Sequence, residues 1–146
     1  MQKVEKAKNS SQLKPETIKK SVVIIDDNAD ILFLVQTILQ MDGYEIYTAK
    51  NGEEALNVLS EIKAPDLIFL DMQMVEMSGP DFLISLEKKL PDLINSVPVV
   101  FLTGMDQVPQ SKAVGCIRKP ITDISQFLKK TQNFIEAGVR NSCYEH

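Results

Sequence analysis

Five polar side chains in this sequence follow directly on, or end, short apolar runs that lie far apart along the chain. They are the carboxylates of Asp26, Asp27 and Asp71, the hydroxyl of Thr103 and the ammonium group of Lys119. Three neighbouring carboxylates repel one another, and a divalent cation relieves that repulsion. Mg²⁺ prefers carboxylate, water and phosphate oxygens, whereas the absence of His and Cys from the set disfavours zinc. These residue types together indicate a site for Mg²⁺-dependent phosphoryl transfer.

Asp71 is the candidate nucleophile of this site. It follows residues 67–70, whose four apolar side chains predict a strand that is buried on both faces. Open α/β sheets bind ligands at the carboxyl ends of their strands, where Asp71 would lie. Asp71 would attack the phosphoryl group while Mg²⁺ bridges the two. Lys119 would neutralise one phosphoryl oxygen, and the Thr103 hydroxyl would donate a hydrogen bond to another.

Each of these residues, taken singly, also has an ordinary structural explanation. Asp26 and Asp27 could cap the following helix, and Thr103 could be a turn residue. Lys119 could be a surface lysine before a helix that Pro120 begins. The occurrence of all five at successive strand ends is what favours a functional site.

The hydrophobic pattern predicts five strands that alternate with helices. The predicted strands are 22–25, 44–49, 67–70, 97–102 and 115–118. The predicted inward-facing helical residues are Ile31, Leu34, Val35 and Ile38; Ala55, Leu56, Leu59 and Ile62, after an Asn51 cap; Phe82, Leu83, Leu86 and Leu90; and Ile124, Phe127, Leu128, Thr131 and Ile135. This order predicts a doubly wound, five-stranded parallel sheet with the flavodoxin-like strand order 2-1-3-4-5.

The connection between the fourth and fifth strands is too short for an ordinary helix. Only the eight residues 104–111 lie between Thr103 and Lys112, and Pro109 interrupts them. An average helix has about 11–12 residues. We therefore expect the fourth helix of the pattern to be shortened or missing.

Length and charge indicate one domain with a basic arm. The chain has 146 residues, of which 44% are hydrophobic, as is usual for a single globular domain. Residues 1–20 hold six Lys and two Glu, whereas the remainder holds ten Lys or Arg against eighteen Asp or Glu. We predict a flexible basic arm over 1–20, a domain over 21–137 and a polar tail over 138–146. The acidic domain argues against nucleic-acid binding.

The sequence also lacks the patterns of exported and membrane-inserted proteins. No apolar run is long enough to span a bilayer, and residues 1–20 have no apolar core of the kind found in signal peptides. Cys116 and Cys143 form neither a disulfide framework nor a metal-binding spacing. We expect a cytoplasmic protein without membrane insertion.

Six short motifs, spread over residues 21 to about 135, are together specific for one family. They are Ile-Ile-Asp-Asp-Asn at 24–28, Asn-Gly-Glu-Glu-Ala-Leu at 51–56, Pro-Asp-Leu-Ile-Phe-Leu-Asp-Met at 65–72, Met-Ser-Gly at 77–79, Val-Val-Phe-Leu-Thr-Gly at 99–104 and Lys-Pro at 119–120. With these motifs the chain resembles the receiver domain of response regulators in two-component signalling.

The resemblance implies a role for each site residue. Asp71 would accept a phosphoryl group from a phosphohistidine on a sensor histidine kinase or a histidine phosphotransfer protein. Asp27 and Asp71 would bind Mg²⁺ directly, together with the backbone carbonyl of Gln73, while Asp26 would act mainly through water. The protein would be a phosphoacceptor that assists its own phosphorylation and dephosphorylation, rather than an enzyme. Its phosphorylation would switch an interaction with a downstream protein, which the sequence does not name.

Two positions depart from the family pattern. Receivers often carry Pro where this chain has Val75, and they usually carry Tyr or Phe where it has Cys116. In the family, that aromatic side chain turns inward when the threonine closes on the phosphoryl group. Cys116 and the short connection therefore predict that the conformational response to phosphorylation differs from the one usual in the family. We hypothesise that the protein signals through another surface or passes its phosphoryl group onward.

Two alternative functions remain open. A degenerate receiver that acts as a constitutive docking module fits Cys116 and the short connection, but the complete acidic site argues against it. A haloacid-dehalogenase-like phosphatase also uses an aspartate, Mg²⁺ and a lysine, but its nucleophile follows the first strand in an Asp-x-Asp pattern. Only 26 residues follow Pro120, too few for a helix-turn-helix. We therefore expect a stand-alone receiver without direct DNA binding.

Overall fold

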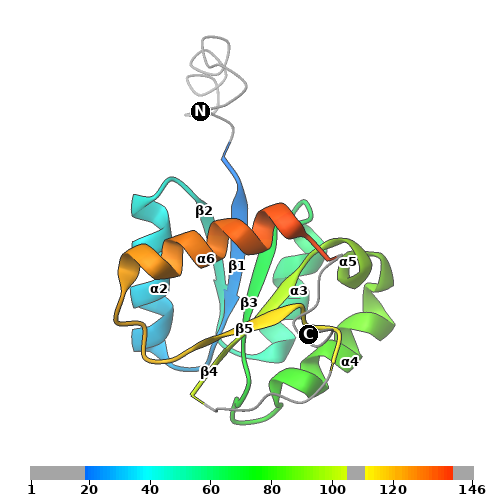
Figure 1. Ribbon diagram of the computed structural model, residues 1–146. Helices are drawn as coiled ribbons and strands as arrows, with labels where there is room; N and C mark the ends of the chain where they lie inside the picture. Colours follow the sequence, from blue (N-terminus) through cyan, green and yellow to red (C-terminus); the bar gives the residue numbers. More distant parts are fainter. Residues whose placement is uncertain (1–18, 105–110, 140–146) are drawn as a thin grey trace, which may run out of the picture.

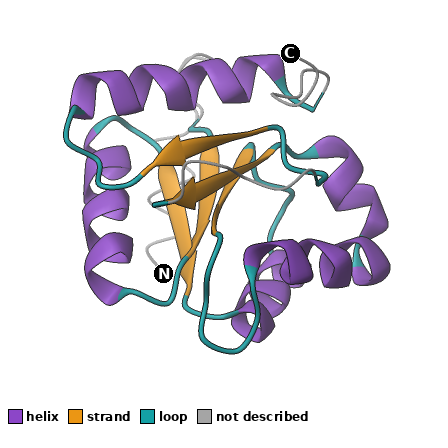
Figure 2. Ribbon diagram, turned by 60° about the horizontal axis from the view of Figure 1, so that its bottom comes forward, coloured by secondary structure: helices purple, strands orange, loops and turns teal. Residues whose placement is uncertain are grey.

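The protein forms a five-stranded parallel sheet with helices on both faces (Figures 1 and 2). This computed structural model describes residues 19–104 and 111–139. The strands are β1 (Ser21–Ile25), β2 (Glu45–Ala49), β3 (Leu67–Asp71), β4 (Val99–Thr103) and β5 (Gly115–Arg118). Their order in the sheet is β2-β1-β3-β4-β5, and every neighbouring pair is parallel. The predicted fold class and strand order are confirmed.

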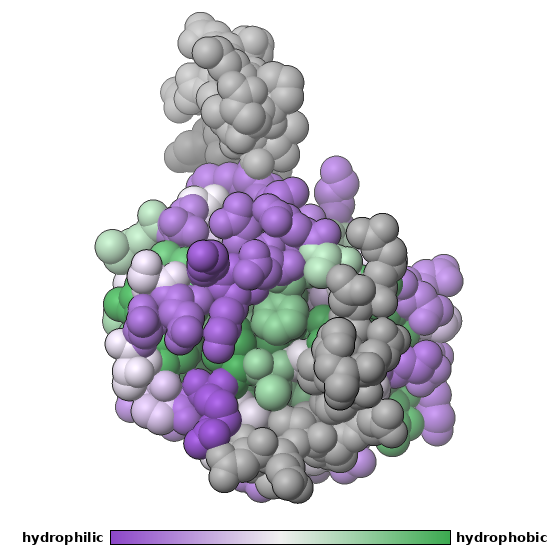
Figure 3. Space-filling view, viewed as in Figure 1, coloured by the Kyte–Doolittle hydropathy of each residue, from purple (hydrophilic) through white to green (hydrophobic). Residues whose placement is uncertain are grey.

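Two layers of helices cover the sheet. The helices are α2 (Ala29–Met41), α3 (Gly52–Glu61), α4 (Gly79–Lys89), α5 (Pro91–Ser96) and α6 (Ile124–Ala137). Helices α2 and α6 pack on one face through Val35, Leu39 and Phe127, whereas α3, α4 and α5 pack on the other. Viewed from the side of α6, hydrophilic residues dominate the outer surface and hydrophobic ones show between them (Figure 3).

Side chains cap the amino ends of four helices and so set where each helix begins. Asn51 accepts a hydrogen bond from the backbone N–H of Glu54 at 2.7 Å, which confirms the predicted cap of α3. Asn28, Ser78 and Asp123 cap α2, α4 and α6 in the same way. Because Asp123 is the cap, α6 begins at Ile124.

Two residues predicted to face inward are exposed instead. Leu34 is 38% exposed because the buried stripe of α2 runs through Val35, Ile38 and Leu39. Ile124 is 52% exposed because it is the first residue of α6 and precedes the turn that carries buried Phe127. In α2 the buried stripe is displaced by part of a turn from the predicted position, whereas in α6 the predicted Phe127 and Thr131 are buried and only Ile124 lies outside the stripe.

Helix α5 was not predicted. Leu90 is the carboxyl cap of α4, and Pro91, which follows it, is the first residue of a second short helix. Proline fits the first helical turn, where its missing N–H has no partner to lose. Leu93 and Ile94 of α5 then complete the hydrophobic cluster beneath α4.

Residues 105–110, which belong to the connection between β4 and β5, lie outside the described residues. The described remainder, Gly104 and 111–114, contains no helix. In this remainder, Nζ of Lys112 lies 3.6 Å from Oε2 of Glu87 in α4.

Most of the two predicted terminal segments also lies outside the described ranges. Only Lys19 and Lys20 of the arm and the first two residues of the tail are described. No helix in these ranges is long and apolar enough to cross a membrane.

Gly79 at the start of α4 lies directly against the end of β3. A Cβ at this position would lie 2.7 Å from the Asp71 carbonyl oxygen and 2.8 Å from a ring carbon of Phe101. We expect Gly79→Ala to lower the free energy of unfolding by about 1–3 kcal/mol, because backbone must shift to admit the methyl group. Urea denaturation measures this. Gly104→Ala is the control, since nothing lies within 4 Å of its Cβ, and an equal loss in both variants would contradict the explanation.

Candidate functional site

The carboxyl ends of four strands meet at one edge of the sheet and bring the predicted polar residues together. Asp26 directly follows β1, Asp71 is the last residue of β3 and Thr103 is the last residue of β4. Lys119 directly follows β5. This edge lies toward the lower side of the view in Figure 1. Because the strands are parallel, residues up to 93 positions apart share this edge.

The three predicted carboxylates form one cluster. One oxygen from each of Asp26, Asp27 and Asp71 lies within 4.8 Å of the others. Asp26 is completely buried and Asp71 is only 6% exposed, whereas Asp27 is exposed to solvent. Neighbouring residues of an extended chain point in opposite directions, which explains why Asp26 and Asp27 differ. The cluster therefore has a buried floor and one solvent-facing carboxylate.

Lys119 joins the two buried carboxylates. Its Nζ lies 3.0 Å from Oδ2 of Asp26 and 3.2 Å from Oδ1 of Asp71. Its backbone N–H donates to the Thr103 carbonyl at 2.7 Å, so the pairing of β5 with β4 sets where the ammonium group lies. Two charge-assisted hydrogen bonds hold the side chain in place.

These contacts shift the pKa values of Asp71 and Lys119. Burial raises the pKa of Asp71, and the charge of Asp26 raises it further, against the opposing effects of Lys119 and the Gln73 N–H. Burial lowers the pKa of Lys119, but the hydrogen bond and charge of Asp26, joined by Asp71, outweigh this, so the pKa is raised overall. Lys119 is therefore charged at neutral pH, and Asp71 takes up a proton more readily than an ordinary aspartate.

Backbone N–H groups fix the three carboxylates. Asn28 donates to Oδ1 of Asp26 at 2.9 Å, and Gln73 donates to Oδ1 of Asp71 at 3.3 Å. Val75 donates to Oδ2 of Asp27 at 2.9 Å. Sequence reasoning missed the donors of Asn28 and Val75. The signal for the second was visible, because Val75 stands where proline, which has no N–H, is frequent in the family.

Thr103 and Cys116, which were also singled out from the sequence, occupy different places in the sheet. Thr103 is buried at the end of β4, with Leu102 beside Asp71 in the strand register. Cys116 is a half-buried free cysteine that is paired in register with Phe101, and it packs with the hydrophobic cluster on the face of α4 and α5. It thus lies within the sheet rather than among the carboxylates.

The donor set fits a hard divalent cation. Among the described residues, the candidate ligand atoms that cluster here are carboxylate oxygens, and one lysine does not neutralise three carboxylates. Mg²⁺ binds such sets together with water and backbone carbonyls. The exposed position of Asp27 gives an ion access from solvent.

Mg²⁺ is expected to stabilise the protein through this cluster. Binding to the folded state alone raises the free energy of unfolding by about 2.7 kcal/mol at one hundred times the dissociation constant. Asp27→Asn should remove most of this increase, because it replaces a cluster carboxylate with an amide. Thermal unfolding with and without Mg²⁺ measures the effect. Asp92→Asn, an exposed aspartate in α5, is the control, and a variant at Asp27 that keeps the full Mg²⁺ effect would contradict the assignment.

Comparison with known proteins identifies the class. Residues 22–132 match the family model of the response regulator receiver domain. The chain therefore belongs to the response-regulator receiver family. It is similar to the polar-differentiation response regulator DivK of Brucella anthropi, with 30% identity over 122 residues that cover 80% of this chain and 96% of DivK.

Solved structures agree with this family. The chemotaxis protein CheY4 of Vibrio cholerae matches with a TM-score of 0.70 and 28% identity, covering 80% of this chain and 98% of CheY4. The response regulator TrrA of Thermotoga maritima, solved in complex with Mg²⁺ and BeF, matches with a TM-score of 0.66 and 30% identity, covering 78% of this chain and 97% of TrrA. The chain spans about a third of the length of other, longer curated relatives.

Proposed function

We propose that this protein is a cytoplasmic phosphoacceptor in a two-component phosphorelay. Asp71 would take a phosphoryl group from a phosphohistidine of a sensor histidine kinase or a histidine phosphotransfer protein. The observation that carries the proposal is the position of Lys119, whose Nζ lies 3.0 Å from Asp26 and 3.2 Å from Asp71. A cation beside Asp71 would neutralise the charge of an incoming phosphoryl group, which supports the proposal.

The reaction is a displacement at phosphorus. A carboxylate oxygen of Asp71 forms a bond to phosphorus while the bond from phosphorus to the histidine nitrogen breaks. The histidine nitrogen keeps the electron pair, and because the other ring nitrogen of the phosphohistidine carries a proton, the leaving group is neutral imidazole. The product is an acyl phosphate on Asp71. Such a transfer depends chiefly on alignment and on neutralising the equatorial phosphoryl oxygens.

The chain's own residues supply these two requirements. Asp71 is held by the Gln73 N–H at 3.3 Å, so its carboxylate keeps one orientation. Lys119 neutralises one phosphoryl oxygen, and the hydroxyl of Thr103 donates to another. Asp26, Asp27, Asp71 and the backbone carbonyl of Gln73 would hold Mg²⁺, which supplies further positive charge beside the phosphoryl group. The complex of TrrA with Mg²⁺ and BeF supports this part of the proposal.

Phosphorylation would then switch a protein–protein interaction. A phosphoryl group on Asp71 competes with the Asp71 carboxylate for the ammonium group of Lys119. The backbone N–H of Lys119 donates a hydrogen bond to the carbonyl of Thr103. The ends of β4 and β5 are thereby coupled to the state of Asp71. With Cys116 in place of an aromatic side chain, we propose that this coupling reaches a surface other than the one common in the family, or that the phosphoryl group passes onward.

The test is intact-mass spectrometry after incubation with acetyl phosphate as a small phosphodonor. The protein is expected to gain one phosphoryl group with Mg²⁺ and none when EDTA removes the ion. A persistent lack of phosphorylation would contradict the proposal and favour a constitutive docking module. Steady hydrolysis of diverse phosphate esters would instead favour a phosphatase of the haloacid-dehalogenase class.

A further inference from the structure

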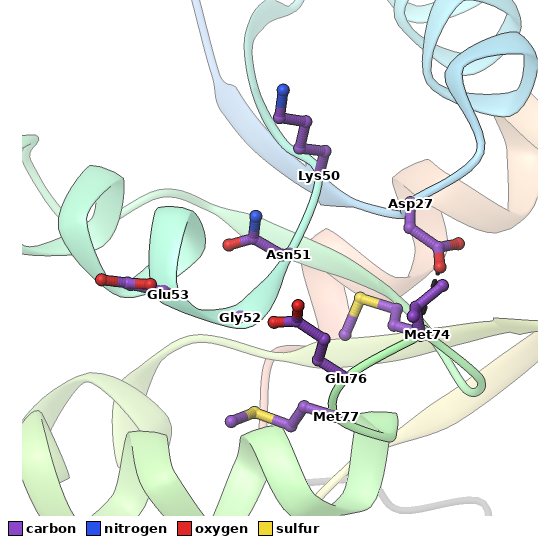
Figure 4. A pocket seen from close by; sticks show the side chains of 9 residues that line it. Asp27, Lys50, Asn51, Gly52, Glu53, Met74, Glu76 and Met77 are labelled. Carbon is purple, nitrogen blue, oxygen red and sulfur yellow. Dashed lines mark hydrogen bonds between the residues drawn. The ribbon is translucent and has the colours of Figure 1, made fainter.

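One hydrogen bond at the metal site links two loops that are far apart in sequence. The backbone N–H of Val75, in the loop between β3 and α4, donates to Oδ2 of Asp27 at 2.9 Å across 48 positions. Figure 4 shows the bond as a dashed line from Asp27. The side chain of Val75 is 89% exposed and Asp27 is also exposed, so burial of these side chains does not hold the pair together.

The loop around Val75 borders a hollow, while its residues Met74 and Met77 also pack against the hydrophobic cluster on the face of α3 and α4. This hollow, about 410 Å³, separates the loop from the residues that begin α3, and its lining includes Asp27, Gly52, Met74 and Met77 (Figure 4). At the far end of the loop, Met77 packs closely on Gly52, since its sulfur lies 2.8 Å from the position that a Cβ on Gly52 would take. Near Val75, the bond to Asp27 connects the loop to the site.

We propose that the Val75 N–H positions Asp27 for the divalent cation, a proposal that rests on the proposed Mg²⁺-dependent function. The hydrogen bond occupies Oδ2 and leaves Oδ1 for the ion. An exposed aspartate otherwise samples several rotamers, and fixing one of them before the ion arrives lowers the entropy lost on binding. Loss of a group that hydrogen-bonds to a metal ligand typically weakens metal affinity about 10–100-fold.

The identity of residue 75 matters through its backbone. Proline, which is frequent at this position in receivers, has no N–H and could not make the bond. Any other residue can supply the donor. This chain therefore carries a carboxylate-fixing group that receivers with proline at this position lack, and its effect is independent of the valine side chain.

The test is the dissociation constant for Mg²⁺, measured by calorimetry without any phosphodonor, in wild type, Val75→Pro and Val75→Ala. Val75→Pro is expected to weaken binding about tenfold or more. Val75→Ala, the conservative replacement that keeps the N–H, is expected to bind Mg²⁺ with an affinity within about twofold of wild type. Unchanged affinity in Val75→Pro, or equal weakening in both variants, would overturn the proposal. A wild type that binds no Mg²⁺ overturns the proposed function as well, so the two failures are distinguishable.

Amide hydrogen exchange measured by NMR tests the bond itself and does not depend on the folding of Val75→Pro. The Val75 amide is expected to exchange slowly in the wild type, both with and without Mg²⁺, and quickly in Asp27→Ala. An amide that exchanges as fast in the wild type as in Asp27→Ala would overturn the proposal. Loss of protection when Mg²⁺ binds would also overturn it, because the ion would then displace the N–H rather than use the oxygen that it leaves open.

Discussion

Asp71→Asn is expected to gain no phosphoryl group under conditions in which the wild type gains one. The amide nitrogen and oxygen of Asn lack the negative charge of the carboxylate and do not form an acyl phosphate. Intact-mass spectrometry with acetyl phosphate and Mg²⁺ measures this. Asp81→Asn, an exposed aspartate in the first turn of α4, is the control and should be modified like the wild type. Full modification of the Asp71 variant would place the acceptor elsewhere.

The same substitution is expected to stabilise the folded protein at neutral pH. Burial, and then the charge of Asp26, raise the pKa of Asp71 above 3.8, so the ionised form costs folding free energy that a neutral amide avoids. Acid protonates Asp71 in the folded chain before it does so in the unfolded chain. The advantage of Asn should therefore shrink as the pH falls from the raised folded pKa toward 3.8. Urea denaturation over a pH series measures it, and an advantage that grows on acidification would contradict this electrostatic explanation.

Lys119→Met is expected to destabilise the protein by about 3 kcal/mol, because it leaves two buried carboxylates without their shared cation. Asp26 is completely buried, whereas the Lys119 side chain is 20% exposed, which places the loss at the lower end of the range for buried pairs. Lys112→Met is the matched control. Its pair with Glu87 spans 3.6 Å between side chains that are about half exposed, and such pairs contribute under about 1 kcal/mol.

Two further measurements separate charge from packing in the Lys119 variant. Mg²⁺ should restore part of the lost stability, because it supplies positive charge to the same carboxylates. The pKa of Lys119 is raised above 10.5 in the fold, so its contribution is complete below 10.5 and disappears as the pH rises through the folded value. The difference between wild type and Lys119→Met should therefore narrow at strongly alkaline pH. Equal urea midpoints for the two proteins at neutral pH would show that the ion pairs contribute nothing.

The sequence predicted the sheet and its polar edge because both follow from a repeating pattern. Apolar runs marked the strands, and parallel pairing then required Asp71, Thr103 and Lys119 to share one edge. The strand order and the receiver family are confirmed. The metal-binding and phosphoacceptor roles of Asp26, Asp27, Asp71, Gln73, Thr103 and Lys119, and the altered switch at Cys116, stay predictions for the experiments above.

What the sequence could not predict depends on angles and backbone contacts. Helical periodicity does not fix the centre of a buried stripe to within one residue, so Leu34 was placed inward although it is 38% exposed. A proline that ends one helix can begin the next, so α5 was missed at Pro91. The donor at Val75 was also missed, because a backbone N–H carries no sequence signal except where proline would remove it.

The ion pair between Asp26 and Lys119 joins positions 93 residues apart. This separation matters while the chain is being synthesised on the ribosome. A nascent chain presents all three aspartates well before β5 and its lysine have been synthesised. Until that last strand pairs with β4, the carboxylates lack the ammonium group that contacts two of them. The polar cluster is therefore completed only when the last strand of the sheet has been synthesised and has paired with β4.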